Sequence, residues 1–172
     1  MKKTVWFPVA AVFAAFILTA CFKDKVEQCT SNTLARDRQI IDSILGSETA
    51  SYTFDNETSV YYRIGNLGSG DQPTTGDSLV AFKYVGRILN GFGDGAIVDS
   101  LTINPPATNA LNYYGNLIGL SYALQKIREG GVISVIIPSS QLFGCNPKSG
   151  VNPVPANSQL IYQYNLTDVK KP

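Results

Sequence analysis

The sequence predicts an α+β domain in which an antiparallel β-sheet packs against one helix. About five segments alternate or carry the β-branched composition of strands, and one segment among them has helical spacing. Turns rich in glycine, proline and asparagine separate these segments. Apolar residues make up 44% of the 172 residues and charged residues 16%, a composition typical of a chain that buries a core. The length suits one domain with a short appendage.

The first twenty residues are typical of a secretory signal. Lys2 and Lys3 precede an uncharged apolar run over 5–18, which is shorter than a membrane span. The run ends in Leu18-Thr19-Ala20-Cys21, which resembles the lipobox of bacterial lipoproteins. The resemblance implies cleavage before Cys21 and lipidation of that cysteine, with several acyl chains anchoring the protein stably. A plain signal with an incidental cysteine, or an uncleaved anchor, are the alternatives.

The residue after the cysteine bears on location. Phe22 stands where an inner-membrane retention signal often has aspartate, which favours the outer membrane. We therefore expect a cell-envelope protein, lipid-anchored at the outer membrane and facing the periplasm.

A polar tether and then a helix over 33–45 are predicted next. Gly46 suits the helix end, and Asp37 falls among the polar residues of the helix. The helix would pack on the domain or link it to the membrane, and dimerisation is a third alternative. Its apolar stripe consists of Ile40, Ile41, Ile44 and Leu45.

The remaining elements define the domain. A helix is predicted over 120–129, where Leu120, Ala123, Leu124 and Ile127 share a face and Gly130-Gly131 follows. Strands are predicted over 59–65, 78–89, 96–100, 132–138 and 159–169, and a long loop over 144–157. The chain thus divides into a signal at 1–20, a tether with a helix at 21–58, and a domain at 59–172.

Composition excludes several kinds of chemistry. The chain has no histidine, which excludes Ser–His–Asp and Cys–His nucleophiles and any zinc site that needs imidazole. Three scattered cysteines do not make a metal cage, so no metal or other cofactor is expected. The chain has 14 basic residues, of which Lys2 and Lys3 lie in the predicted signal, so 12 basic residues remain against 13 acidic ones. The basic residues form no stripe, which argues against nucleic-acid binding.

Cys29 and Cys145 could pair or stay free in an oxidising compartment. We expect an unpaired Cys145.

Three segments in order resemble the FKBP family of peptidyl-prolyl isomerases. The first is GDSLVAFKYVGRILNG at 76–91, which is similar to the family's opening strand. The second is LIGLSYALQKIREGGVISVIIPSSQLFG at 117–144, similar to its pocket floor, central helix, double glycine and aromatic–glycine pair. The third is VPANSQLIYQYNLTDV at 154–169, similar to its proline turn and closing strand. The resemblance implies an FKBP-like fold, a strongly bent antiparallel sheet wrapped around a short central helix.

The resemblance also implies a site for proline-containing polypeptide segments and for macrolide inhibitors. Tyr84, Asp99 and Phe143 match catalytic positions. For Asp99 the alternative is a turn cap, since an aspartate at a strand end often has that role. Leu117 and Ile118 match the segment whose backbone N–H binds a ligand carbonyl. The remaining substrate-binding positions match Val98, Leu120 and Tyr162.

Three of these positions depart from the usual family residues. Leu120 stands for the tryptophan of many members, Phe143 lacks the tyrosine hydroxyl, and Val98 is smaller than phenylalanine. Isomerisation needs no acid, base or nucleophile, only a pocket that binds the twisted amide better than the planar one. The resemblance therefore implies an isomerase that assists the folding of exported proteins. The alternative is a weakly active or inactive binding or scaffold lipoprotein in an envelope complex.

Overall fold

The structure is a computed structural model that describes residues 28–90, 95–115, 117 and 119–171. The predicted signal, Cys21 and Ile118 lie outside the described residues. Among the residues that are described, no helix has the length and apolar character needed to cross a membrane.

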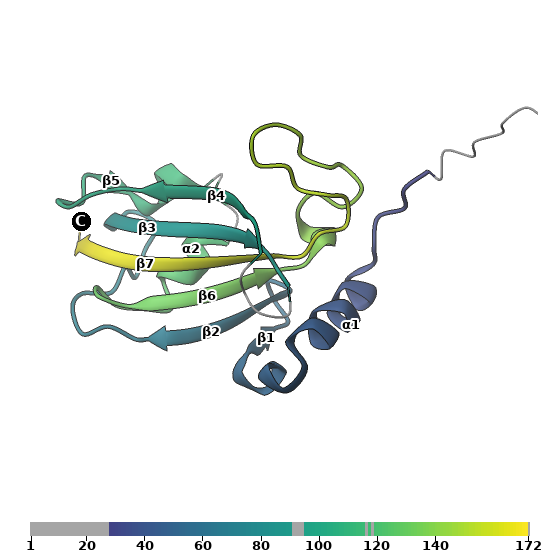
Figure 1. Ribbon diagram of the computed structural model, residues 1–172. Helices are drawn as coiled ribbons and strands as arrows, with labels where there is room; N and C mark the ends of the chain where they lie inside the picture. The colour runs from purple at the N-terminus through teal and green to yellow at the C-terminus, as the bar shows by residue number, and fades with distance from the viewer. Residues whose placement is uncertain (1–27, 91–94, 116, 118, 172) are drawn as a thin grey trace, which may run out of the picture.

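One antiparallel sheet forms the body of the protein (Figure 1). Its strand order is β1-β2-β6-β7-β3-β4, and the short β5 pairs with β3. The long β7 lies between β3 and β6 and pairs with both over most of its length. The strands are β1 (Thr53–Asp55), β2 (Val60–Asn66), β3 (Leu79–Ile88), β4 (Ile97–Thr102), β5 (Asn109–Ala110), β6 (Val132–Ile137) and β7 (Leu160–Lys170).

Alternation along the strands separates two faces of this sheet. The inner face packs on the helix α2 (Leu120–Leu124) and the 3₁₀-helix η4 (Leu111–Tyr114), and Figure 1 shows α2 behind the strands. Buried residues of β3, β6 and β7 join α2 in the main core, among them Phe82, Val135 and Leu166. The predicted α+β fold, with its helix laid across an antiparallel sheet, is confirmed.

The helix α2 is shorter than the predicted 120–129. After Leu124 the backbone tightens into turns, with the N–H of Lys126 and Ile127 bonded three residues back. The N–H groups of Arg128 and Glu129 then bond to carbonyls of the β2–β3 connection, at Leu67 and Asp71. Tertiary partners therefore replace local ones from Arg128 onward.

The helix α1 (Leu34–Leu45) packs on the outer face of the sheet at one end, which is the first of the alternatives that its stripe left open. It begins at Thr33, whose side chain accepts a hydrogen bond from the Arg36 N–H. It ends at Gly46, whose φ of 52° suits glycine. Ile41 of α1 packs with outer-face residues of the sheet in a second core cluster, which contains Tyr61, Leu89 and Ile136.

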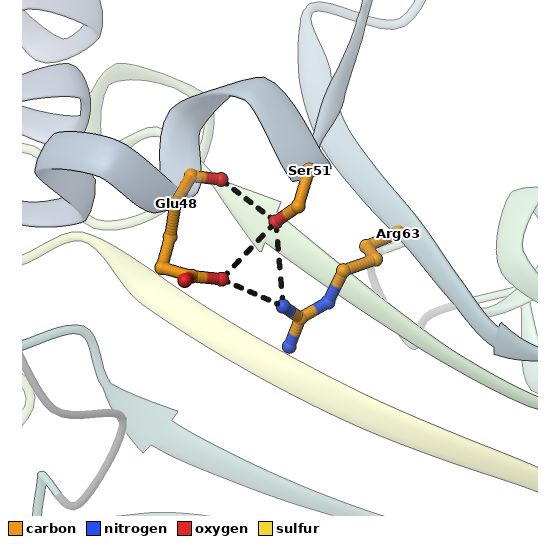
Figure 2. A network of polar contacts seen from close by, with 3 residues as sticks. All are labelled: Glu48, Ser51 and Arg63. Carbon is orange, nitrogen blue, oxygen red and sulfur yellow. Dashed lines mark hydrogen bonds and ion pairs between the residues drawn. The ribbon is translucent and has the colours of Figure 1, made fainter.

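The 3₁₀-helix η3 (Gly46–Ser51) is attached to β2 by a small polar network (Figure 2). The Arg63 guanidinium lies 3.4 Å from a Glu48 carboxylate oxygen and donates to the Ser51 hydroxyl at 3.3 Å. The Ser51 hydroxyl in turn donates to the Glu48 carbonyl at 2.7 Å. Both charged side chains are largely exposed, so this ion pair contributes little, about 0–1 kcal/mol.

The β6–β7 connection carries the 3₁₀-helix η5 (Ser139–Gln141) and the long loop, which stands out from the end of the sheet in Figure 1. Cys145 in this loop forms a disulfide with Cys29, with Cα atoms 5.7 Å apart. The expectation of an unpaired Cys145 is wrong. The pairing depends on how the N-terminal segment folds back over the loop, which a separation of 116 residues does not reveal.

Candidate functional site

Tyr84 lies on the inner face of β3 and is 4% exposed. Its hydroxyl donates to a carboxylate oxygen of Asp99 at 2.9 Å, and Asp99 itself lies in β4 beside β3. Burial, followed by this hydrogen bond and the Asp99 charge, raises the pKa of Tyr84 well above its usual value. The hydroxyl therefore stays protonated at every physiological pH and acts as a donor to the carboxylate.

Aromatic rings surround Tyr84. The Tyr162 and Tyr164 rings on β7 lie 5.7 Å and 5.6 Å from the Tyr84 ring, centroid to centroid. Tyr162 faces Gly86 across the β3–β7 ladder, and a Cβ at Gly86 would stand 2.5 Å from the Tyr162 ring. Glycine at position 86 thus lets the Tyr162 ring lie across β3. Burial and then the Asp99 charge raise the pKa of Tyr162 to about 12.

Tyr162 joins two apolar clusters. It packs against the main core, which contains Tyr84 and Leu120, with Leu117 also packed against it. It also packs against a smaller cluster that contains Val98 and has Phe143 at its side. Tyr84, Val98 and Leu120 are buried, whereas Asp99, Leu117, Phe143 and Tyr162 are partly exposed. The sequence-predicted residues are thus distributed over two clusters, with Tyr162 packed against both.

The backbone donor predicted in this region has a partner within the chain. The Leu117 N–H donates to the Tyr114 carbonyl at 2.8 Å. A substrate carbonyl would have to displace this bond in order to use that N–H. The other predicted donor, Ile118, lies outside the described residues.

Two hollows lie near these elements. One, of about 560 Å³, is lined by Leu101, Leu117 and the Asn112–Gly115 turn, and it borders the predicted site at Leu117. The other, of about 390 Å³, is lined by Val85, Ile161 and Gln163 together with Tyr52 and Arg63. Because Val85 and Ile161 alternate with Tyr84 and Tyr162 along their strands, the second hollow opens on the outer face, away from the Asp99 side of the sheet.

Sequence reasoning did not find every ring near Tyr84. Phe82 stacks at 6.5 Å from the Tyr84 ring, and Tyr114 meets Phe82 edge-on at 4.9 Å. The alternation of Phe82 and Tyr84 along β3 could have signalled the first. Tyr114 lies between residues 101 and 116, outside the three segments on which the resemblance was based. Among the described residues, histidine, cysteine, aspartate and glutamate form no group of three placed to hold a metal ion.

Comparison with known proteins bears on these residues. The family model for FKBP-type peptidyl-prolyl cis-trans isomerases matches residues 70–167, more than half of the chain. The chain is 30% identical over 115 residues to the FKBP-type peptidyl-prolyl cis-trans isomerase FkpA of Escherichia coli K12, an alignment that covers 67% of this chain and 39% of the relative. It is 31% identical over 104 residues to FK506-binding protein 4 of Emericella nidulans, covering 60% of this chain and 20% of that protein. The chain thus spans well under half the length of these relatives.

Solved structures show the same fold. A peptidyl-prolyl cis-trans isomerase from Pseudomonas syringae superposes with a TM-score of 0.55 at 21% identity, covering 83% of this chain and 99% of that one. The crystal structure of FkpA from Escherichia coli gives a TM-score of 0.51 at 23% identity, covering 79% and 58%. The family model, which matches residues 70–167, spans β3, β4, β6 and α2 and most of β7, and this match shows the family. This chain belongs to the FKBP-type peptidyl-prolyl cis-trans isomerase family.

Proposed function

We propose that the chain is a peptidyl-prolyl cis-trans isomerase that acts on proline-containing segments of exported proteins. The single observation that carries this proposal is that the partly exposed Tyr162 packs against the core that contains Tyr84 and Leu120, next to the Asp99 carboxylate that accepts the Tyr84 hydroxyl. These residues come from three separate segments of the family-matched region. In this proposal the proline ring contacts Tyr162 and Phe143 at the partly exposed edge, above the buried Val98 and Leu120.

The proposed chemistry needs no proton transfer. Rotation about an X–Pro bond is opposed by amide resonance, with a barrier of about 18–20 kcal/mol. Halfway through rotation the amide has lost resonance and its carbonyl dipole is reduced. An apolar surface therefore favours the twisted amide over the planar one relative to water, and this difference accelerates rotation. The Tyr84–Asp99 pair supplies a fixed dipole and charge at the edge of this surface, which would orient the substrate carbonyl.

A protease-coupled assay tests the proposal. The full-length chain in detergent micelles would be mixed with a short peptide that carries an apolar residue before proline, and the cis-to-trans rate would be followed. We expect acceleration over buffer, and more of it for an apolar residue than for a charged one at that position. A rate equal to that in buffer at micromolar protein would contradict the proposal.

A binding or scaffold module with little catalysis is the second candidate. The Leu117 N–H bonded to Tyr114, and Phe143 without a hydroxyl, favour it, because both reduce the donors offered to a substrate carbonyl. Saturable binding of the same peptide without acceleration would support this candidate. Displacement of the peptide by a proline-mimicking macrolide would place binding at the proposed site in either case.

We further propose that the chain is anchored in the cell envelope by lipid on Cys21, at the outer membrane and facing the periplasm. The Cys29–Cys145 disulfide supports an oxidising compartment such as the periplasm. Cys21→Ser is expected to release the protein from the membrane fraction. Continued membrane association of this variant would contradict the anchor.

A further inference from the structure

We propose that Asp37 is a positioning residue for the candidate site, because its carboxylate fixes the loop that carries Phe143. We call residues 139–145 the Phe143 loop. Asp37 belongs to α1, outside the family-matched residues 70–167. The inference rests on the proposed function in so far as Phe143 contacts substrate.

Asp37 is fully buried, which is unusual for a carboxylate. One of its oxygens accepts hydrogen bonds from the Ser139 hydroxyl at 2.8 Å and from the Gln159 amide at 2.6 Å. The same oxygen accepts from the Asn32 amide at 2.9 Å, and the other oxygen accepts from the Ser140 N–H at 2.7 Å. Four donors therefore compensate the loss of hydration, and two of them belong to the Phe143 loop.

The bonded residues control the backbone on both sides of Phe143. The Gln159 side chain, held by Asp37, also accepts the Ser139 N–H at 2.8 Å. The Ser139 carbonyl in turn accepts the N–H of Leu142 at 3.0 Å and of Gly144 at 2.9 Å. Asp37 thus fixes Ser139, and Ser139 fixes the two residues that flank Phe143.

The N-terminal segment holds the far end of the same loop. Cys29 is bonded covalently to Cys145, and the Cys145 N–H donates to the Ser31 hydroxyl at 3.0 Å. A Cβ at Gly144 would stand 2.6 Å from that hydroxyl oxygen, so the segment lies directly against the loop. The Phe143 loop is therefore held at Ser139–Ser140 by Asp37 and at Cys145 by residues 29–31. Between these points Phe143 packs beside Val98 and Tyr162.

Asparagine is an informative replacement for Asp37. Asp37→Asn keeps the size of the side chain but turns one acceptor oxygen into an NH₂ donor. The new NH₂ group would face other donors: either the Ser140 N–H, or the three side chains that donate to the other oxygen in the wild type. The loop would lose its anchor without creation of a cavity.

Asp42 offers a matched control in the same helix. Its carboxylate accepts the Tyr61 hydroxyl at 3.0 Å and so attaches α1 to β2. Asp42→Asn removes the same charge from α1, keeps an oxygen that can accept the Tyr61 hydroxyl, and makes no change at the Phe143 loop. An effect specific to the loop should therefore appear in the Asp37 variant alone.

The experiment compares the full-length wild type, Asp37→Asn and Asp42→Asn in detergent micelles. Hydrogen exchange read by mass spectrometry follows the amides of residues 139–146, with β3 and β7 as the internal reference. Steady-state kinetics on the X–Pro peptide give KM and kcat separately. We expect about tenfold faster exchange in the Phe143 loop of Asp37→Asn and unchanged exchange in β3 and β7. If the loop is then in place in only one molecule in ten, the fraction of protein that is competent to bind the peptide falls about tenfold. KM therefore rises about tenfold, while kcat is nearly unchanged.

Three outcomes would overturn the inference: unchanged loop exchange in Asp37→Asn, an equal effect in Asp42→Asn, or faster loop exchange with an unchanged KM.

If Asp37→Asn fails to fold, Ser139→Ala removes one of the four donors and is expected to act in the same direction with a smaller change. A wild type that does not accelerate isomerisation would contradict the proposed function. The exchange comparison, together with the Kd of the peptide, would then still decide whether Asp37 positions the loop.

Discussion

The hydrogen bond between Tyr84 and Asp99 is the polar contact at the centre of the candidate site. Tyr84→Phe removes the hydroxyl, which donates to the carboxylate at 2.9 Å, and keeps the ring that packs against Tyr162 and Tyr164. The change therefore separates the polar contribution of Tyr84 from its apolar one.

The expected magnitude follows from the burial of the two partners. A hydrogen bond to a charged group contributes about 1.5–3 kcal/mol. Asp99 is partly exposed, so water can replace the lost donor and the cost falls at the lower end, about 1.5 kcal/mol. If the pair also orients the substrate carbonyl, kcat/KM falls by about tenfold, since 1.4 kcal/mol corresponds to one factor of ten.

A double-mutant cycle measures this contribution. Urea unfolding and the peptide assay would be run on Tyr84→Phe, Asp99→Ala and the double variant. We expect a coupling energy of about 1 kcal/mol in stability and a similar one in kcat/KM. Additive effects within about 0.3 kcal/mol would refute the reasoning, since they would mean that the two groups act independently.

Three further predictions follow from single positions. Phe143→Tyr places a hydroxyl donor at the edge of the site, and we expect kcat/KM to rise by about two- to tenfold; a peptide assay that shows no gain would argue against this placement of Phe143. Gly86→Ala brings a Cβ to 2.5 Å from the Tyr162 ring, and chemical unfolding should show a loss of about 1–3 kcal/mol together with a higher KM. Hydrogen bonds, first that from the Thr58 N–H, lower the pKa of Asp55 to about 2, from the usual aspartate value of 3.8. A lowered folded-state pKa means that this stabilisation is complete above about pH 4 and is lost as the pH falls toward 2, so Tm should fall less over this window in Asp55→Asn than in the wild type.

Local patterns predicted most of the fold. The stripe and Gly46 predicted α1 to within a residue, because the periodicity and the cap are properties of the segment itself. The same holds for β3 and β7, whose residues alternate, and for β6, which is a continuous apolar run that is buried almost throughout. The end of α2 could not be predicted, because the Arg128 N–H bonds to Leu67, a partner that the local sequence does not reveal. The strand β1 has only three residues, too few for a periodic signal.

The candidate site was predictable only in part, for a similar reason. Tyr84 and Tyr162 lie on alternating strands within family-like segments, which indicated their common face. Asp37 gave no such signal, since a carboxylate among arginines on a helix is ordinarily solvated. Its burial depends on donors from Ser139, Ser140 and Gln159, more than a hundred residues away in the chain.

The most direct test of the account is an NMR titration of the isotope-labelled protein with an X–Pro peptide. The account predicts that the largest shifts occur at Asp99, Phe143 and Tyr162, with faster cis–trans exchange of the peptide. Outer-face residues such as Val85 and Ser134 should remain unchanged. Shifts confined to the outer-face hollow, or a peptide that exchanges no faster than in buffer, would contradict the account.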